Sequence, residues 1–153
     1  AYGARTILPD TQQQRPFIVY APVQTDKTSE AVLELKKELQ KYIDNEPATQ
    51  KEVAKVSSDN VNSLPGLFET QSSVVGLLAS NVRFNRPDTY IYDYEKQMRN
   101  LSYDAVRNAA VELISPDSLT WIIVADLKKI ETKIRDLKMG NVEILDSSGK
   151  IIE

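Results

Sequence analysis

The chain has 153 residues, of which 41% are hydrophobic and 27% charged, enough for one globular domain with a core of its own. Its net charge of −3 argues against a nucleic-acid partner held by bulk charge. No apolar run approaches the roughly 20 residues that a membrane-spanning helix requires. The chain starts without methionine and without a signal-like pattern, so we expect a fragment of a longer protein.

The sequence contains neither cysteine nor histidine. Without cysteine the chain can form no disulfide and offers no thiolate as nucleophile or metal ligand. Without histidine it lacks the commonest zinc ligand and the commonest general base at neutral pH. Ser-His-Asp and Cys-His catalytic arrangements and histidine-based zinc motifs are therefore excluded. The five glycines are scattered, so the phosphate-binding signatures G-x-G-x-x-G and P-loop are absent as well.

The N-terminal part is expected to form a hairpin followed by a helix. Residues 2–8 alternate loosely, and residues 17–23 form a β-branched and aromatic run, so both are predicted strands. The polar stretch between them is the expected hairpin loop. Asp26 or Thr28 is predicted to cap a helix that runs to about residue 44, because apolar side chains recur there every three or four residues.

Four further helices are expected next, separated by turn and capping residues. Thr49 and Glu52 have the spacing of a capping box, and Ser102 is a good N-cap. Gly76 lies inside one of these helices and costs roughly 1 kcal/mol relative to alanine, which predicts close packing at this position. The expected helices cover residues 49–63, 67–83, 87–101 and 102–113.

The C-terminal part contains the predicted centre of a sheet. Residues 119–125 are apolar on both faces, which is typical of a central strand covered on both sides. A short amphipathic helix is expected over 127–137, and residues 142–145 and 150–152 are predicted strands. We therefore expect residues 1–153 to form a single α+β domain of two layers, a mainly antiparallel sheet with helices packed largely on one face.

One group of acidic side chains on the first helix has two interpretations. Glu30, Glu34 and Glu38 recur at helical spacing and could together hold a divalent cation. Lys37 and Lys41 lie beside them, which favours a solvated helix face with ion pairs. We prefer the solvated face.

Two aromatic segments could also bind a ligand. Tyr90, Tyr92 and Tyr94 suggest a binding face, but helical spacing places the first and third together and the second elsewhere, which favours packing. Residues 83–86, Arg-Phe-Asn-Arg, could stack on a nucleic acid. Because this segment is short and the chain acidic, we interpret it as a solvated helix end.

A series of short stretches resembles the C-terminal half of the pitrilysin/insulinase-type zinc metallopeptidases, the inverzincins. Their order and spacing are similar to that family over nearly the whole chain, although no single stretch is diagnostic. The stretches are residues 2–5 (YGAR), 16–28 (PFIVYAPVQTDKT), 47–52 (PATQKE), 64–70 (LPGLFET), 101–110 (LSYDAVRNAA) and 115–126 (SPDSLTWIIVAD).

The resemblance implies a non-catalytic role. In that family two homologous halves close around an unfolded peptide, and one half carries the H-x-x-E-H zinc motif and the base that activates the zinc-bound water. A chain without histidine looks like the other half, with a fold similar to the LuxS/processing-peptidase-like metallohydrolases. Its implied partners are the zinc-bearing half or subunit and an unfolded peptide, with no nucleic acid and no membrane span. Alone it should bind no zinc and cleave nothing.

The resemblance implies one substrate contact in this chain. The family grips its substrate with an arginine and a later tyrosine in a segment like R-x-x-K-G-Y-x-Y-G, and this chain begins at what would be the last tyrosine, Tyr2. We therefore expect a substrate-binding role for Tyr2 and the adjacent strand alone. No catalytic and no metal-binding residue is expected in the chain.

Two other functions stay open. Some relatives of these peptidases are core proteins of respiratory complexes without proteolytic activity, so the chain could be a structural subunit of a larger assembly. It could also be an unrelated α+β binding module. An H-x-x-E-H motif upstream in the same gene or in its neighbour would favour the peptidase. Similar bacterial proteins suggest the periplasm or cell envelope as the compartment, with the cytoplasm as the alternative.

Overall fold

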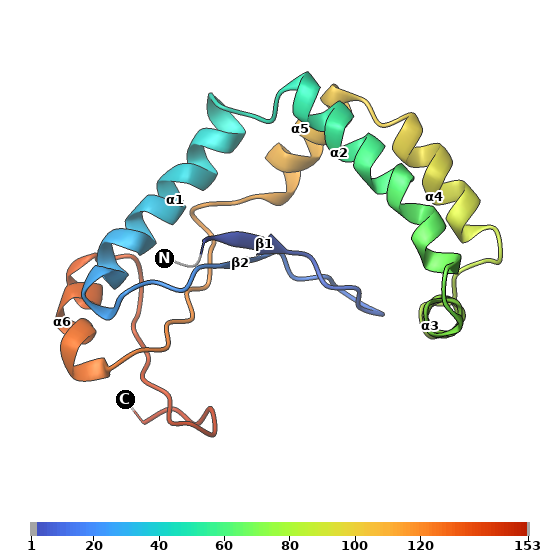
Figure 1. Cartoon of the computed structure of the whole chain (residues 1–153). Helices are drawn as coiled ribbons and strands as arrows, with labels where there is room; N and C mark the ends of the chain where they lie inside the picture. Colours follow the sequence, from blue (N-terminus) through green and yellow to red (C-terminus); the bar gives the residue numbers. More distant parts are fainter. Residues whose placement is uncertain (1–2, 153) are drawn as a thin grey trace.

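Residues 3–152 are described by a computed structural model, in which helices predominate (Figure 1). The strands are β1 (Arg5–Ile7) and β2 (Ile18–Tyr20), and the 3-10 helices are η1 (Thr25–Lys27) and η2 (Leu64–Phe68). The α-helices are α1 (Thr28–Asp44), α2 (Gln50–Ser63), α3 (Gln71–Arg83), α4 (Tyr90–Arg99), α5 (Tyr103–Leu113) and α6 (Leu127–Asp136).

The helices form an open arch around the hairpin (Figure 1). One limb is α1, and the other is α2 with α4 packed beside it; α5 lies near the top and contacts both α1 and α2. At the foot of the first limb, α6 packs on α1 and η1. The hairpin of β1 and β2 lies on the inner side of the arch, and its loop reaches toward α3 at the foot of the second limb.

The predicted two-layer α+β fold with a mainly antiparallel sheet is wrong. Within residues 3–152 the sheet has two strands of three residues each, which pair antiparallel and so confirm the predicted hairpin. Residues 119–125 are extended but join no sheet, and the predicted strands near the C-terminus reduce to one bridge between Leu145 and Ile151. The apolar pattern indicates burial, but a strand also needs a neighbour for its backbone N–H and C=O groups.

The helices lie close to where the sequence predicts them, because their hydrogen bonds and caps are local. The capping box at the start of α2 is confirmed: Thr49 Oγ1 accepts the Glu52 N–H at 3.2 Å, and the Glu52 carboxylate accepts the Thr49 N–H at 2.7 Å. At the start of α5, Ser102 Oγ accepts the Ala105 N–H at 3.1 Å, as predicted.

The start of α1 differs from the prediction. Neither Asp26 nor Thr28 caps it; the N-cap is Lys27, which makes no side-chain cap, because η1 leads the chain directly into the helix. The buried Thr28 hydroxyl instead donates to the Thr25 carbonyl at 2.9 Å. The Asp26 carbonyl accepts a hydrogen bond from Lys133 of α6 at 3.5 Å, so this turn joins α1 to α6.

The arch buries few apolar side chains. Within the described residues, the buried ones are Val32, Val53, Val61, Ile130 and the ring of Pro116. The chain exposes 12042 Å², whereas a compact monomer of 17.2 kDa exposes about 7,800 Å². Large apolar side chains on the hairpin, on α3 and in residues 119–125 contribute to this surface. The fold therefore leaves a large apolar area available to a partner.

The close packing predicted at Gly76 is wrong for this arrangement, because a Cβ atom added there meets nothing within 4 Å. We expect Gly76→Ala to raise the free energy of unfolding by about 0.5 to 1 kcal/mol, since glycine loses more backbone entropy than alanine in a helix. Urea unfolding followed by circular dichroism measures the change. The exposed Ala79 lies on the same helix, and Ala79→Gly serves as the reverse control. Lower stability in Gly76→Ala would indicate that another surface packs there.

Candidate functional site

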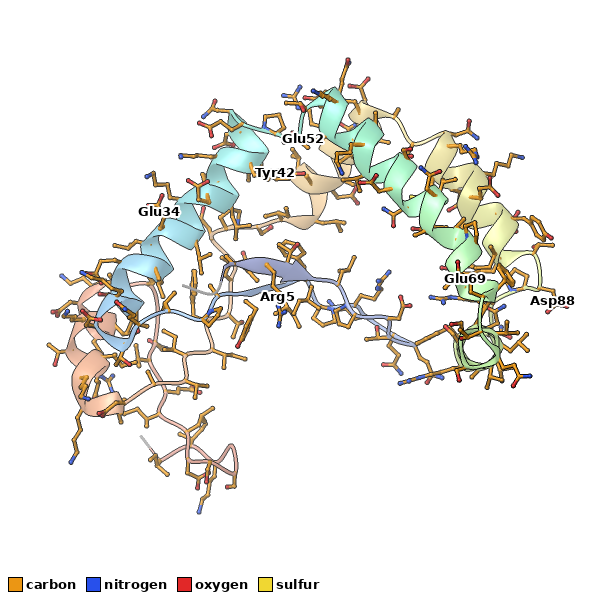
Figure 2. All side chains as sticks on the ribbon, in the orientation of Figure 1. Arg5, Glu34, Tyr42, Glu52, Glu69 and Asp88 are labelled. Carbon is orange, nitrogen blue, oxygen red and sulfur yellow. The ribbon has the colours of Figure 1, made fainter. Side chains whose placement is uncertain are left out.

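The predicted substrate contact can be placed only through its neighbour, because Tyr2 lies outside the described residues. The adjacent strand, β1, is exposed along its whole length on the inner side of the arch, where Arg5 is labelled in Figure 2. The guanidinium carbon of Arg5 lies 5.0 Å from the centre of the Tyr20 ring across the hairpin, within cation–π distance. The strand is therefore accessible, and its one ring contact is made within the hairpin.

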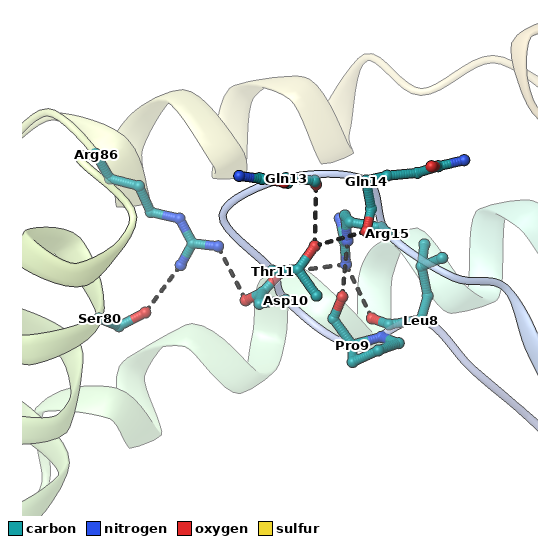
Figure 3. A network of polar contacts seen from close by, with 9 residues as sticks. All are labelled: Leu8, Pro9, Asp10, Thr11, Gln13, Gln14, Arg15, Ser80 and Arg86. Atoms are coloured by element: carbon teal, nitrogen blue, oxygen red, sulfur yellow. Dashed lines mark hydrogen bonds and ion pairs between the residues drawn. The ribbon is translucent and has the colours of Figure 1, made fainter. Parts of the chain in front are cut away.

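The loop between β1 and β2 is shaped by its own polar groups (Figure 3). Arg15 donates from Nε to the Pro9 carbonyl at 3.0 Å and from Nη2 to the Leu8 carbonyl at 2.9 Å. The same Nη2 lies 3.2 Å from the carboxylate of Asp10. The Thr11 hydroxyl lies 3.0 and 3.2 Å from two further loop carbonyls. These bonds hold the loop in one conformation without a regular turn.

Arg86, in the turn between α3 and α4, fixes this loop to the foot of the arch (Figure 3). Its Nη2 donates to Asp10 Oδ2 at 2.9 Å, and its Nη1 donates to Ser80 Oγ at 3.0 Å. The guanidinium carbon also lies 4.3 Å from the centre of the Tyr90 ring and 4.9 Å from that of Phe84. The Arg86 side chain is 18% exposed, so these contacts are partly shielded from water.

A second hydrogen bond joins the same two segments, from Gln12 Nε2 to the carbonyl of Arg83 at 2.8 Å. We call the contact of Asp10 with Arg86 and that of Gln12 with Arg83, together with the Arg86–Ser80 hydrogen bond, the clasp. The interpretation of residues 83–86 as a solvated helix end is wrong for Arg86. The sequence offers one signal, an arginine beside aromatic residues, but nothing in it identifies a partner 76 positions away. The clasp therefore positions the loop against α3.

The acidic face of α1 is a solvated, ion-paired surface, as preferred above, and Figure 2 shows Glu34 on the outer side of the arch. The pairs are Lys27–Glu30 at 3.4 Å, Glu34–Lys37 at 3.3 Å and Glu38–Lys41 at 2.8 Å. The hydrogen bond from Lys41 and its positive charge lower the pKa of Glu38, and a backbone hydrogen bond lowers the pKa of Glu30. A general acid needs a raised pKa, so the lowered pKa values of Glu30 and Glu38 do not suit that role.

Two hollows in the described part of the chain do not resemble sites for a small ligand. Tyr42 of α1 and Tyr103 of α5 line a cavity of about 10 Å³, which has room for about one water molecule. A depression of about 340 Å³ on α1 is open to solvent and lined by polar and charged side chains, with Leu33 the one large apolar member. Small-molecule sites are instead enclosed and mostly apolar.

The aromatic side chains of α4 follow their helical spacing. Tyr90 and Tyr94 are half-buried with ring centres 6.3 Å apart, while Tyr92 is exposed elsewhere on the helix, as predicted. The Tyr94 hydroxyl donates to Asn60 Oδ1 of α2 at 3.2 Å. These rings therefore pack the second limb of the arch and do not form a binding face.

The most extensive uncovered features are apolar. On α3, the apolar side chains of Val75, Leu78 and Val82 are open to solvent, and Val82 is 84% exposed. In residues 119–125, Ile122 is 85% and Val124 is 96% exposed. Exposed apolar side chains of this kind mark sites of protein association. The candidate functional sites are therefore three apolar docking surfaces, one on the inner hairpin, one on α3 and one on residues 119–125.

Within residues 3–152, no three acidic side chains come together in a way that could hold a metal ion, and no helix is both long and apolar enough to cross a membrane. Comparisons with protein-family models, with curated proteins and with solved structures found no match for this chain. The resemblance to the zinc metallopeptidases accordingly stays a prediction.

Proposed function

We propose that this chain is a non-catalytic domain of a zinc-dependent metallopeptidase, where it helps to form the chamber that holds a peptide substrate. The observation that supports this proposal is the open arch with its uncovered apolar surface. The chain, of 17.2 kDa, exposes 12042 Å², whereas a compact monomer of this mass exposes about 7,800 Å². Burial of such surface against a second domain would stabilise both.

The proposal divides the chemistry between two halves of the peptidase. The zinc, its histidine ligands and the base for the attacking water belong to the partner half, because this chain contains no histidine or cysteine. This chain would contribute part of the wall of the peptide chamber. The exposed strand β1 and the apolar side chains around it would hold the peptide and exclude water. The clasp keeps the loop beside β1 in place.

A cleavage assay tests the proposal. The chain would be assayed alone, and then together with a half that carries H-x-x-E-H and is encoded in the same or the neighbouring reading frame. The substrate is an unstructured peptide with a fluorophore and a quencher, and each reaction is run with zinc and with chelator. We expect no cleavage by the chain alone, and cleavage by the pair that the chelator abolishes.

The control is a pair whose zinc-bearing half carries glutamine in place of the glutamate of H-x-x-E-H, which should bind peptide but not cleave it. Zinc-dependent cleavage by the chain alone would contradict the proposal. So would a zinc-bearing half that is equally active with and without this chain. A stable pair without any cleavage would favour the structural subunit considered from the sequence.

A further inference from the structure

Residues 119–125 form an extended segment without a hydrogen-bonding neighbour. Between Leu119 and Ala125 no backbone N–H or C=O group bonds to any other group in the part of the chain that the structure describes. The nearest backbone hydrogen bonds are turns on either side, Ser118 N–H to Ser115 and Lys129 N–H to Asp126, both at 3.0 Å. The segment is uncharged and rich in β-branched residues. Such an unpaired edge is a ready template for pairing with another strand.

The side chains of this segment already alternate as they would in a sheet. Leu119, Trp121 and Ile123 are half-buried against the molecule, whereas residues 120, 122 and 124 are exposed. Two of these outward residues, Ile122 and Val124, are large and apolar. Side chains of a strand point alternately to opposite faces, so the segment has the form of a strand and lacks a partner.

We propose that a second copy of this chain supplies the partner, through antiparallel pairing of residues 119–125 about a two-fold axis at Ile122. In this register Ile122 lies opposite its own copy, and Thr120 lies opposite Val124. On the other face, Trp121 lies opposite Ile123. Each pair is uncharged and contains a β-branched residue, and such cross-strand pairs are favourable. A shift by one residue would set the outward residues opposite the half-buried ones, so the burial pattern excludes that register. Among the registers that keep the alternation, the one centred on Ile122 pairs residues 119–125 over their full length.

The flanks and the available area suit a symmetric dimer. Asp117 before the segment pairs with Lys36 at 2.7 Å, and Asp126 after it pairs with Lys129 at 3.2 Å, so both carboxylates are neutralised within their own chain. The chain exposes about 4,200 Å² more than a compact monomer of its mass. A stable homodimer buries roughly 2,000 to 5,000 Å² over both partners. A two-fold contact also closes on itself and does not propagate into a fibre.

Sedimentation velocity over a range of concentrations tests this dimer with the full 153-residue chain. We expect dimers for the unchanged chain. Ile122→Lys and Ile122→Glu should each weaken self-association more than about tenfold, because the two-fold axis sets like charges opposite each other. An equimolar mixture of the two variants should associate again, as a heterodimer detectable by native mass spectrometry. Residue 122 is exposed, so circular dichroism should show an unchanged fold.

Tyr92→Lys is the matched control, since the Tyr92 side chain is 76% exposed but lies on α4, away from the apolar docking surfaces. This variant should associate like the unchanged chain. A chain that stays monomeric at every concentration would overturn the proposal, as would unchanged association of Ile122→Lys. Equal loss in Tyr92→Lys would show that an added surface charge, and not the contact at Ile122, weakens association, and would also overturn the proposal. Failure of the mixed variants to associate would exclude the two-fold axis at Ile122. The result is independent of the proposed function, because no zinc-bearing partner is present.

Discussion

Replacing Ile130 by alanine is expected to lower the free energy of unfolding by about 2 to 3 kcal/mol, because the substitution removes buried methylene and methyl groups and leaves a cavity. Ile130 is 6% exposed and lies on α6, which packs on α1 and η1. On α1, Thr28 and Val32 are the buried residues. Since so few apolar side chains are buried in this arch, each one carries a large share of its stability. Urea unfolding followed by circular dichroism measures the loss.

The matched control for this prediction is Ile152→Ala, which makes the same chemical change on a side chain that is 64% exposed. Its effect should stay within about 0.5 kcal/mol. Hydrogen exchange adds a local readout: amides of α6 should exchange faster in Ile130→Ala, while those of α2 and α4 should change less. Equal losses in the two variants would show that α6 does not pack on α1 as described.

The second large effect is expected at the clasp, where Arg86→Met should cost about 2 kcal/mol. The substitution keeps a long side chain over Tyr90 but removes the charge-assisted hydrogen bonds to Asp10 and Ser80 and the cation–π contact. Hydrogen bonds to charged groups contribute about 1.5 to 3 kcal/mol, and cation–π contacts about 0.5 to 2 kcal/mol. Faster hydrogen exchange in residues 8–16 would accompany the loss, because the loop would no longer be fixed to α3.

Arg99→Met is the control for the clasp. Arg99 also forms an ion pair, with Glu95 at 2.7 Å, but both side chains are exposed on one helix, so the loss should be about 0.5 kcal/mol or less. A double-mutant cycle with Asp10→Asn separates the pair itself from the ring contacts. If the free energies for Arg86 and Asp10 were simply additive, the clasp would not join the loop to the arch.

The helices could be predicted because the groups that make them are neighbours in sequence. The capping box of Thr49 and Glu52 and the Ser102 cap act over three residues, and the apolar spacing of α1 reports one face of one helix. Even among the helices, the predicted N-cap of α1 was wrong. The turn η1, held by contacts with α6, replaced the expected side-chain cap.

The sheet could not be predicted in the same way. The hairpin was found because its two strands are linked by one loop, whereas residues 119–125 were assigned to a central strand from their apolar character. That character indicates which side chains favour burial. It does not provide the neighbouring strand, and in this fold none lies beside the segment within the described residues.

In the candidate site, too, some features could be predicted from the sequence and others depend on tertiary contacts. The absence of histidine and cysteine, the ion-paired face of α1 and the separation of Tyr92 from Tyr90 and Tyr94 follow from the sequence alone. The clasp does not, because Asp10 and Arg86 are distant in sequence and meet only when the hairpin lies inside the arch.

The sequence by itself determined the helix positions, the hairpin and the absence of histidine and cysteine. The tertiary structure decided which apolar faces are covered, where the hairpin loop is fixed and which extended segment lacks a partner. The physical reason is the range of the interactions: helix hydrogen bonds and caps close within four residues, whereas strand pairing and burial depend on groups that the fold brings together.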